Sequence, residues 1–221
     1  MSMENHSTTP EPTEGFRDPT GLMKWTRGFL YVGIVSCLLG MWSSARDLLG
    51  GGGEADLDIG LRVIFWIFTG LPVPLITAVL VLTWIHRVNH NARQLGAAGM
   101  RFTPGWAVGW HFVPIAWFWK PYQAMTEIWR ASRNPADWRG KPVSPLLHWW
   151  WFLWIVPTWS LLIVDLAARR NLEETDAENV EAAAELVSWI LEIPLIFVLL
   201  AIIAAVHRMQ TEHHRAQVAT S

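Results

Sequence analysis

The chain has 221 residues, of which 52% are hydrophobic and only 16% are charged, and its formal net charge at pH 7 is −2. This composition is typical of an integral membrane protein with one domain, and it gives no support to nucleic-acid binding. Because Cys37 is the single cysteine and lies within an apolar run, an internal disulfide and a cysteine-based metal site are excluded.

The first part of the chain, residues 1–21, is polar and contains three prolines. Such a segment cannot bury enough apolar surface to fold, so we expect a disordered N-terminal tail. It has no apolar h-region, so a cleaved signal peptide is not predicted and the first membrane segment directs insertion.

Four apolar segments are long enough to cross a bilayer as helices, which takes about 20 residues each. We therefore expect an all-α integral membrane domain over residues 22–210, followed by a C-terminal tail over 211–221. The four predicted transmembrane helices cover approximately residues 25–45, 63–85, 146–168 and 186–206.

Small residues recur four apart in the first of these helices, as Gly33 with Cys37 and Ser36 with Gly40. Such pairs allow the backbone of a second helix to approach closely. We expect this face of the helix to pack within the bundle.

A central element over residues 103–131 differs from the four crossings. Thr103 followed by Pro104 predicts a helix N-terminus, and Pro114 interrupts the backbone ladder about two turns later. The apolar run that follows the cap is too short to cross a bilayer. We therefore predict a re-entrant or interfacial half-helix that enters the membrane without crossing it.

An amphipathic helix is predicted directly after this half-helix. Its apolar residues recur at helical spacing, and its polar residues fall elsewhere on the helical wheel. Such a helix suits the headgroup layer of a membrane. The apolar positions are Tyr122, Met125, Ile128 and Trp129, and the polar ones are Gln123, Glu127, Arg130 and Arg133.

The charges predict the orientation. The region 86–145 carries eight basic and two acidic residues, whereas the loops at 46–62 and 165–185 are predominantly acidic. Basic residues mark the cytoplasmic side. We expect a multi-pass protein of the cytoplasmic (inner) membrane with both termini in the cytoplasm. Ten of the sixteen tryptophans lie between positions 106 and 154, which is typical of residues at a membrane interface.

The central motif resembles the signature of a family of bacterial multi-pass membrane proteins known as domain of unknown function 4328. The resemblance extends from the first membrane segment to the last and implies an integral membrane domain without an established activity. Trp117 departs from it, since the family pattern leads us to expect Asn there. The residues that carry the resemblance include Asn89, Arg93, Trp106, Gly109, Trp110, Pro114, Trp119, Lys120, Pro121, Tyr122, Gln123, Met125 and Trp129.

Five histidines map to the half of the protein that is predicted to be cytoplasmic, and imidazole is a common ligand of metals and haem. Histidine is also an ordinary residue of membrane interfaces, and no cysteine, HExxH or paired-carboxylate motif accompanies these five. We predict neither a cofactor nor a metal. The five residues to check are His86, His90, His111, His148 and His207.

Two acidic residues, Glu192 and Asp165, lie inside predicted transmembrane helices. A carboxylate in hydrocarbon is costly and usually faces the bundle or a water-filled cavity. Glu192 could relay protons or bind a cation, with Arg62 or Arg46 as its ion-pair partner. The alternative is a purely structural pair, or a side chain that reaches toward the acidic loop. Asp165 can pair with Arg169 one helical turn later.

No catalytic motif is recognisable, so we do not expect an enzyme. The sequence favours a scaffold or sensor that presents a basic, tryptophan-rich cytoplasmic face to the lipid bilayer, with anionic lipids or a protein partner as its targets. A homo-oligomer stays open. The alternative from another class is a small channel or transporter in which the half-helix and Glu192 line a pathway.

Overall fold

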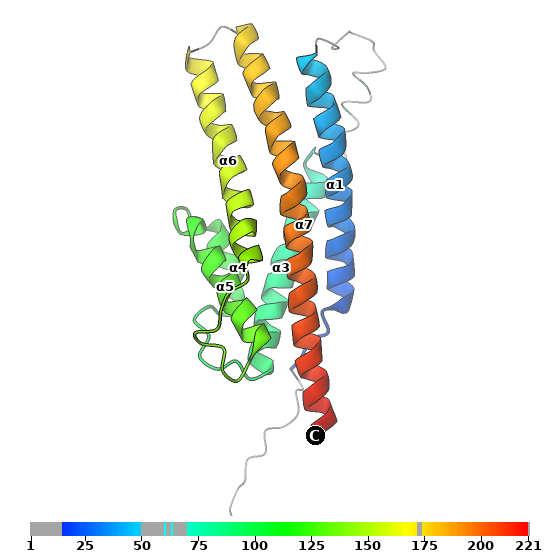
Figure 1. The fold of residues 1–221 in the computed structure, drawn as a ribbon, viewed down its shortest axis with the longest axis vertical. Coiled ribbons are helices and arrows are strands. Elements are labelled where there is room, and N and C mark those ends of the chain that lie inside the picture. Colours follow the sequence, from blue (N-terminus) through cyan, green and yellow to red (C-terminus); the bar gives the residue numbers. More distant parts are fainter. Residues whose placement is uncertain (1–14, 50–59, 61–62, 64–69, 172–173, 221) are drawn as a thin grey trace, which may run out of the picture.

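The computed structural model describes residues 15–49, 60, 63, 70–171 and 174–220, and all the regular elements within them are helices (Figure 1). The long helices are α1 (Thr20–Leu48), α3 (Pro72–Gln94), α6 (Pro145–Asn171) and α7 (Glu174–Thr220). Between α3 and α6 lie the short helices α4 (Pro104–Gly109), η2 (Trp110–Phe112), η3 (Ala116–Phe118) and α5 (Lys120–Arg133).

Three helices of the described part are long and apolar enough to cross a membrane, over Thr20–Arg46, Pro72–Gln94 and Asn179–Thr220. They correspond to the first, second and fourth predicted crossings. The third prediction falls on α6, which is a helix of 27 residues, and its crossing stays a prediction. The beginning of the second predicted segment, up to residue 69, lies largely outside the described residues.

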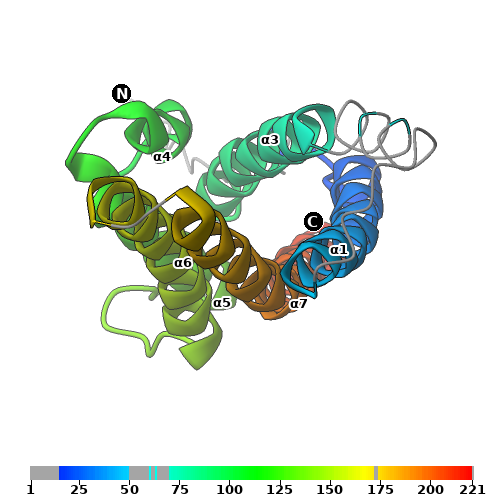
Figure 2. The same ribbon diagram turned by 90° about the horizontal axis from the view of Figure 1, so that it is seen from above.

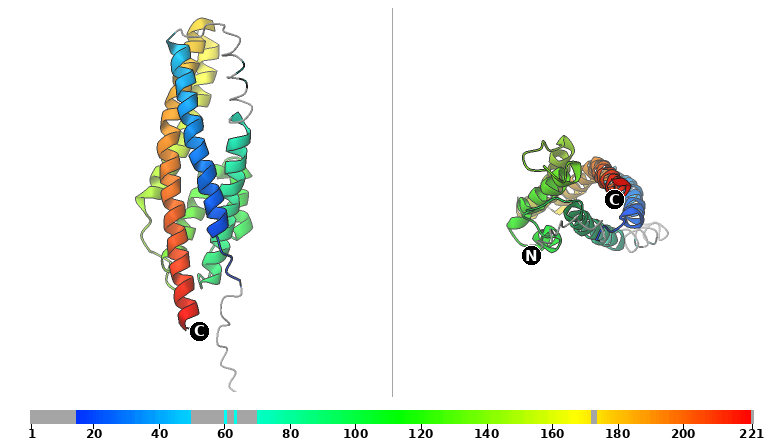
Figure 3. Two further views of the ribbon diagram at one scale, coloured as in Figure 1. Left: turned by 90° about the vertical axis from the view of Figure 1, so that its right-hand side faces the viewer. Right: turned by 90° about the horizontal axis from the view of Figure 1, so that it is seen from below.

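The long helices alternate in direction and form a bundle in which α7 contacts α1, α3, α5 and α6 (Figure 1). The beginning of α1 and the end of α7 lie at the same end of the molecule (Figure 3). There the Phe16 ring stacks on His214, with ring centroids 4.0 Å apart. The four long helices, which alternate in direction, account for this arrangement.

Two predicted tails are partly built into the fold. The described part of the N-terminal tail packs on α3, where Asn91 Nδ2 donates to the Arg17 carbonyl at 2.8 Å and Asn91 Oδ1 accepts from the Arg17 N–H at 3.0 Å. The C-terminal residues, which we expected to leave the helix at 211, continue α7 to Thr220. Most of these residues are exposed, and Gln217 Nε2 ties them to the protein by donating to the Leu95 carbonyl at 3.2 Å.

The buried core is concentrated in the half of the bundle that contains the central element. Helix α5, which we predict to suit the headgroup layer, encloses two of its polar side chains while Arg133 at its end is exposed. Glu127 is only 6% exposed, and Ser132 is fully buried. The reason is that α5 packs between α3, α6 and α7. Gln210 of α7 joins these elements, because its Nε2 donates to the Val88 carbonyl at 2.8 Å and to Ser132 Oγ at 2.9 Å.

Glu127 holds the loop that leads into the half-helix. Its two carboxylate oxygens accept hydrogen bonds from the backbone N–H groups of Arg101 at 2.8 Å and Phe102 at 3.0 Å. From the other side, Asn89 Nδ2 and Arg93 donate to the Phe102 carbonyl, each at 3.0 Å. An irregular loop can be buried here because side chains from two helices satisfy its backbone groups.

We expect Glu127→Gln to lower the free energy of unfolding by about 2 to 3 kcal/mol. The glutamine oxygen can accept from only one of the two buried N–H groups, and its NH2 group, which is itself a donor, faces the other. Thermal unfolding in mild detergent measures the effect. Glu212→Gln, on the exposed part of α7, is the matched control and should leave the melting temperature unchanged. Equal stability of the two variants would contradict this account of the loop.

The predicted topology is tested with cysteines introduced into a Cys37→Ser background at Ala98, Ala136 and Leu49, all of which are exposed. A membrane-impermeant maleimide added to intact cells should label the cysteine at position 49 alone. The other two should become reactive together once the membrane is opened, because the element between them enters the membrane and returns. Labelling of positions 98 and 136 from opposite sides would refute four crossings.

Candidate ligand-binding cavity

A cavity of about 460 Å³ lies among helices α1, α3, α6 and α7. Viewed along the bundle, α3, α1 and α7 curve around a common centre, with α6 beside them (Figure 2). The lining is predominantly apolar and includes Phe29, Leu82, Trp150, Trp154 and Trp189. Small-molecule sites in proteins have this size and this mixture of apolar walls with a few polar groups.

The polar groups of the lining are few, and Glu192 is the acidic residue among them. The Cys37 thiol of α1 lies beside the Glu192 carboxyl of α7. The hydroxyl groups of Ser36 and Thr77 also border the cavity, and each donates to a backbone carbonyl of its own helix, at 3.1 Å and 2.7 Å.

The sequence predicted an ion pair of Glu192 with Arg62 or Arg46. Arg62 lies outside the described residues. Arg46 lies nine residues beyond Cys37 on α1, which is about 13 Å along the axis. Its guanidinium sits over the Trp42 ring, 5.2 Å from the centroid. The register of α1 against α7 therefore places Cys37 rather than Arg46 beside this carboxyl, and the pairing with Arg62 stays a prediction.

The small-residue face of α1 packs against α7, as predicted. A Cβ atom added to Gly33 would lie 3.4 Å from the Ile196 side chain, and one added to Gly40 would lie 2.6 Å from the Trp189 indole. Cys37, between these two glycines, meets Glu192. The absence of side chains at 33 and 40 thus brings α1 close to α7 and fixes the position of Trp189.

The half-helix delivers two residues to the cavity. The predicted cap is confirmed, since Thr103 Oγ1 accepts from the Trp106 N–H at 3.3 Å, but α4 ends at Gly109 and continues only as the 3₁₀ turn η2. His111 and Phe112 of η2 line the cavity. Burial lowers the pKa of His111, more than its hydrogen bond to the Val108 carbonyl raises it, so the imidazole stays neutral at pH 7.

Aromatic contacts join α6 to the turn after Pro114. Ile115 adopts a φ of 67°, a left-handed conformation that is unusual for a β-branched residue. Two residues later, Trp117 and Phe118 pack against α6. The ring centroids lie 5.4 Å apart for Trp117 and Trp154 and 5.0 Å apart for Phe118 and Trp159. Trp117, the departure from the family pattern, thus fills an aromatic cluster that borders the cavity wall.

Several of the signature residues pack in the contact between α5 and α6. Pro121, Met125 and Trp129 are buried on α5, and Tyr122 packs against His148 and Trp151 of α6 at 5.8 and 6.0 Å between ring centroids. Others stay at the surface, where Trp106 is 54% exposed and Trp119 is 43% exposed. The Lys120 ammonium lies 5.3 Å from the Trp110 ring. Asn89 and Arg93 hold the preceding loop, as described above.

The structure does not bring the five candidate histidines together. His90 Nε2 lies 2.9 Å from the Gly15 carbonyl and His148 packs on Tyr122, whereas His111 alone of the five lines the cavity. Across the described part of the chain, no group of three or more His, Cys, Asp or Glu side chains could hold a metal ion. The side chain of Asp165 is not among those that the structure describes.

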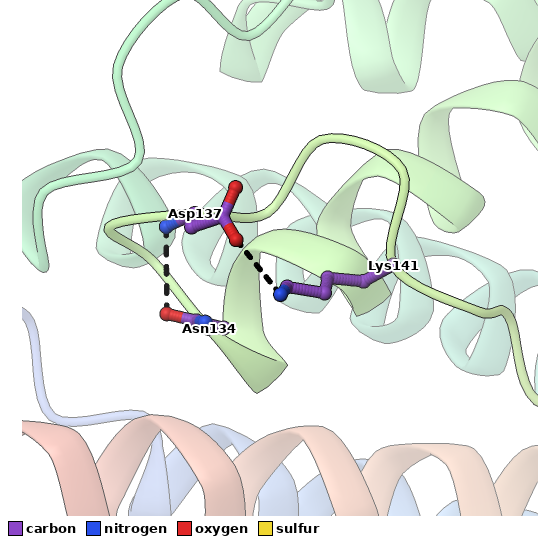
Figure 4. A network of polar contacts seen from close by, with 3 residues as sticks. All are labelled: Asn134, Asp137 and Lys141. Atoms are coloured by element: carbon purple, nitrogen blue, oxygen red, sulfur yellow. Dashed lines mark hydrogen bonds and ion pairs between the residues drawn. The ribbon is translucent and has the colours of Figure 1, made fainter.

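Several basic residues of the central region serve the protein itself. The Arg139 guanidinium donates to the Gly99 carbonyl at 3.4 Å, and Arg93 donates to the Met100 carbonyl at 3.0 Å. In the loop after α5, the Lys141 ammonium pairs with Asp137 at 2.7 Å, and Asn134 Oδ1 accepts from the Asp137 N–H at 3.4 Å (Figure 4). The basic face is therefore partly committed to internal contacts.

Sequence reasoning identified Glu192 but missed the cavity, Trp189 and the pairing with Cys37. The small-residue pairs of α1 carried part of this information, because they indicate which face of α1 approaches a neighbour. They do not say which helix or which register that neighbour has.

Comparisons with known proteins place the chain in a family. Neither the curated proteins nor the solved structures yield a match. A family match covers residues 54–211, more than half of the chain, and begins after α1 rather than at the first membrane segment as expected from the motif. The chain belongs to the family described as Domain of unknown function (DUF4328).

Proposed function

We propose that this protein is a non-enzymatic membrane sensor that binds a small, predominantly apolar molecule in the cavity among α1, α3, α6 and α7. The observation that carries this proposal is the presence of Glu192, in an otherwise mainly apolar lining, beside residues of the half-helix. A buried carboxyl in a membrane helix is costly and is a functional-site hypothesis by default.

The half-helix links the cavity to the basic region. Phe112 belongs to η2 and is 72% exposed, so a ligand that fills the cavity contacts a side chain with room to move. Helix η2 contacts α5, and α5 carries Arg130 and Arg133 in its last turn, on the side that we propose to be cytoplasmic. A ligand shifts such an element only through contacts that differ between two arrangements, and the aromatic packing around η2 and η3 supplies them.

The output of the sensor is the face that the sequence singled out. Trp106, Ile115 and Trp119 of the central element are exposed, and the same element carries Lys120, which suits a surface that dips into lipid. The targets we propose are anionic lipids of the cytoplasmic membrane, or a protein partner, with both termini of the chain in the cytoplasm. A second copy of the chain is a further possible partner.

A small channel or transporter is the second candidate function, and one observation favours it. Glu192 and the half-helix residues His111 and Phe112 border the same space, as a pathway through the bundle would require. Irregular backbone at membrane depth is tolerated where it is buried in protein or lines a cavity. Binding and conduction make different demands on the cavity, so two experiments separate the candidates.

The binding proposal predicts that Ala78→Phe, which places an aromatic ring at a cavity-lining position, removes a small molecule that co-purifies with the wild-type protein in mild detergent. Mass spectrometry of the purified protein detects the molecule. Ala201→Phe, at an exposed position of α7 outside the lining, is the control and should retain it. Retention by both variants, or a wild-type protein that carries nothing, argues against a binding cavity.

The sensor proposal also predicts that proteoliposomes containing the protein pass protons and small cations no faster than protein-free liposomes. The reason is that a mainly apolar lining with one carboxyl offers no chain of polar groups for an ion to follow. Fluorescent dyes for pH and for K⁺ measure the flux. A flux that disappears in Glu192→Gln would replace the sensor with the channel or transporter.

A further inference from the structure

We propose that the ligand of this cavity carries one positive charge on a nitrogen atom, and that this ammonium group binds between the Glu192 carboxylate and the tryptophan walls. The inference rests on the proposed function, because it names the chemical class of the molecule that the cavity takes. The rest of that ligand is hydrocarbon.

Charge is the first argument. Among the described residues that line the cavity, Glu192 is the acidic one, and neither Lys nor Arg is present. The polar group beside its carboxyl is the thiol of Cys37, which is at most a weak donor. A carboxylate at membrane depth is stabilised chiefly by a cation beside it. The described lining supplies neither Lys nor Arg at this point, so a cationic ligand would complete the pair.

The tryptophans are the second argument. Trp189 precedes Glu192 by three residues on α7, so both side chains occupy one face of the helix. Gly40 fixes the indole of Trp189 against α1, since any Cβ at position 40 would overlap it. On helix α6, the rings of Trp150 and Trp154 are parallel, with centroids 6.3 Å apart. Indole faces attract ammonium groups more strongly than other aromatic rings do.

An inorganic cation fits this lining less well than an organic one. Ions such as Ca²⁺ take six to eight oxygen ligands, and Mg²⁺ demands an octahedral set. The described lining offers the Glu192 carboxyl and the hydroxyls of Ser36 and Thr77, and each hydroxyl already donates to its own helix backbone. The aromatic and aliphatic walls match an alkyl chain. An alkylammonium molecule satisfies both parts of the cavity.

The test compares two probes that differ in charge but hardly in size, decylamine and decanol. Binding to the full-length protein in mild detergent is measured by equilibrium dialysis. We expect the amine to bind about tenfold or more tightly than the alcohol, because the ammonium gains both the carboxylate and the indole faces. Glu192→Gln should remove this preference and leave decanol binding unchanged. Glu192→Asp should retain most of it.

Controls separate the possible failures. Glu212→Gln removes a carboxylate from the exposed part of α7 and should change neither affinity. If both probes bind equally well and Glu192→Gln affects neither, the ammonium inference is wrong while the binding cavity stands. If neither probe binds, and Ala78→Phe loses no co-purifying molecule, the proposed function fails as well. Should Glu192→Gln not fold, the two probes on the wild-type protein and on Glu192→Asp still decide.

Discussion

The close approach of α1 and α7 is the constraint on which the rest of this structure depends. Between two membrane helices the hydrophobic effect contributes little, so contact rests on small residues and on satisfied polar groups. Gly33 and Gly40 remove the side chains that would separate the helices, and Cys37 meets Glu192 between them. Because this contact orients α7, it determines both where the carboxyl of Glu192 points and where the C-terminal half of α7 reaches α3 and α5.

In the C-terminal half of α7, helix contacts rest on hydrogen bonds between polar side chains and not on small residues. Gln210 bridges α3 and α5, while Glu127 and Asn89 satisfy the backbone of the loop at Phe102. These buried groups are costly unless each finds its partner, so they specify one arrangement of the loop. The half-helix begins directly after that loop. Its position in the cavity wall therefore follows from a hydrogen-bond network some distance from the cavity.

The features predicted correctly from the sequence are local in origin. The cap at Thr103, the small-residue face of α1 and the existence of the apolar helices each follow from a few neighbouring residues. What depends on tertiary contact was missed or misjudged. Helix α5 has the pattern of an interfacial helix, yet α3, α6 and α7 enclose even its Glu127. The position of Cys37 beside Glu192 was missed because it depends on the register of α1 against α7, which no local pattern encodes.

The family match covers some of the helices that line the cavity and leaves out α1. The matched residues 54–211 include the walls from α3, the half-helix, α6 and the membrane part of α7, and with them Glu192 and the tryptophans. They leave out α1, which supplies Cys37 and the glycines that fix Trp189. The carboxyl and its aromatic surroundings therefore lie in the part shared with the family profile, whereas the contact that orients them comes from a helix outside it. A change of residues on α1 alone would alter the shape of the cavity while its charge stays the same.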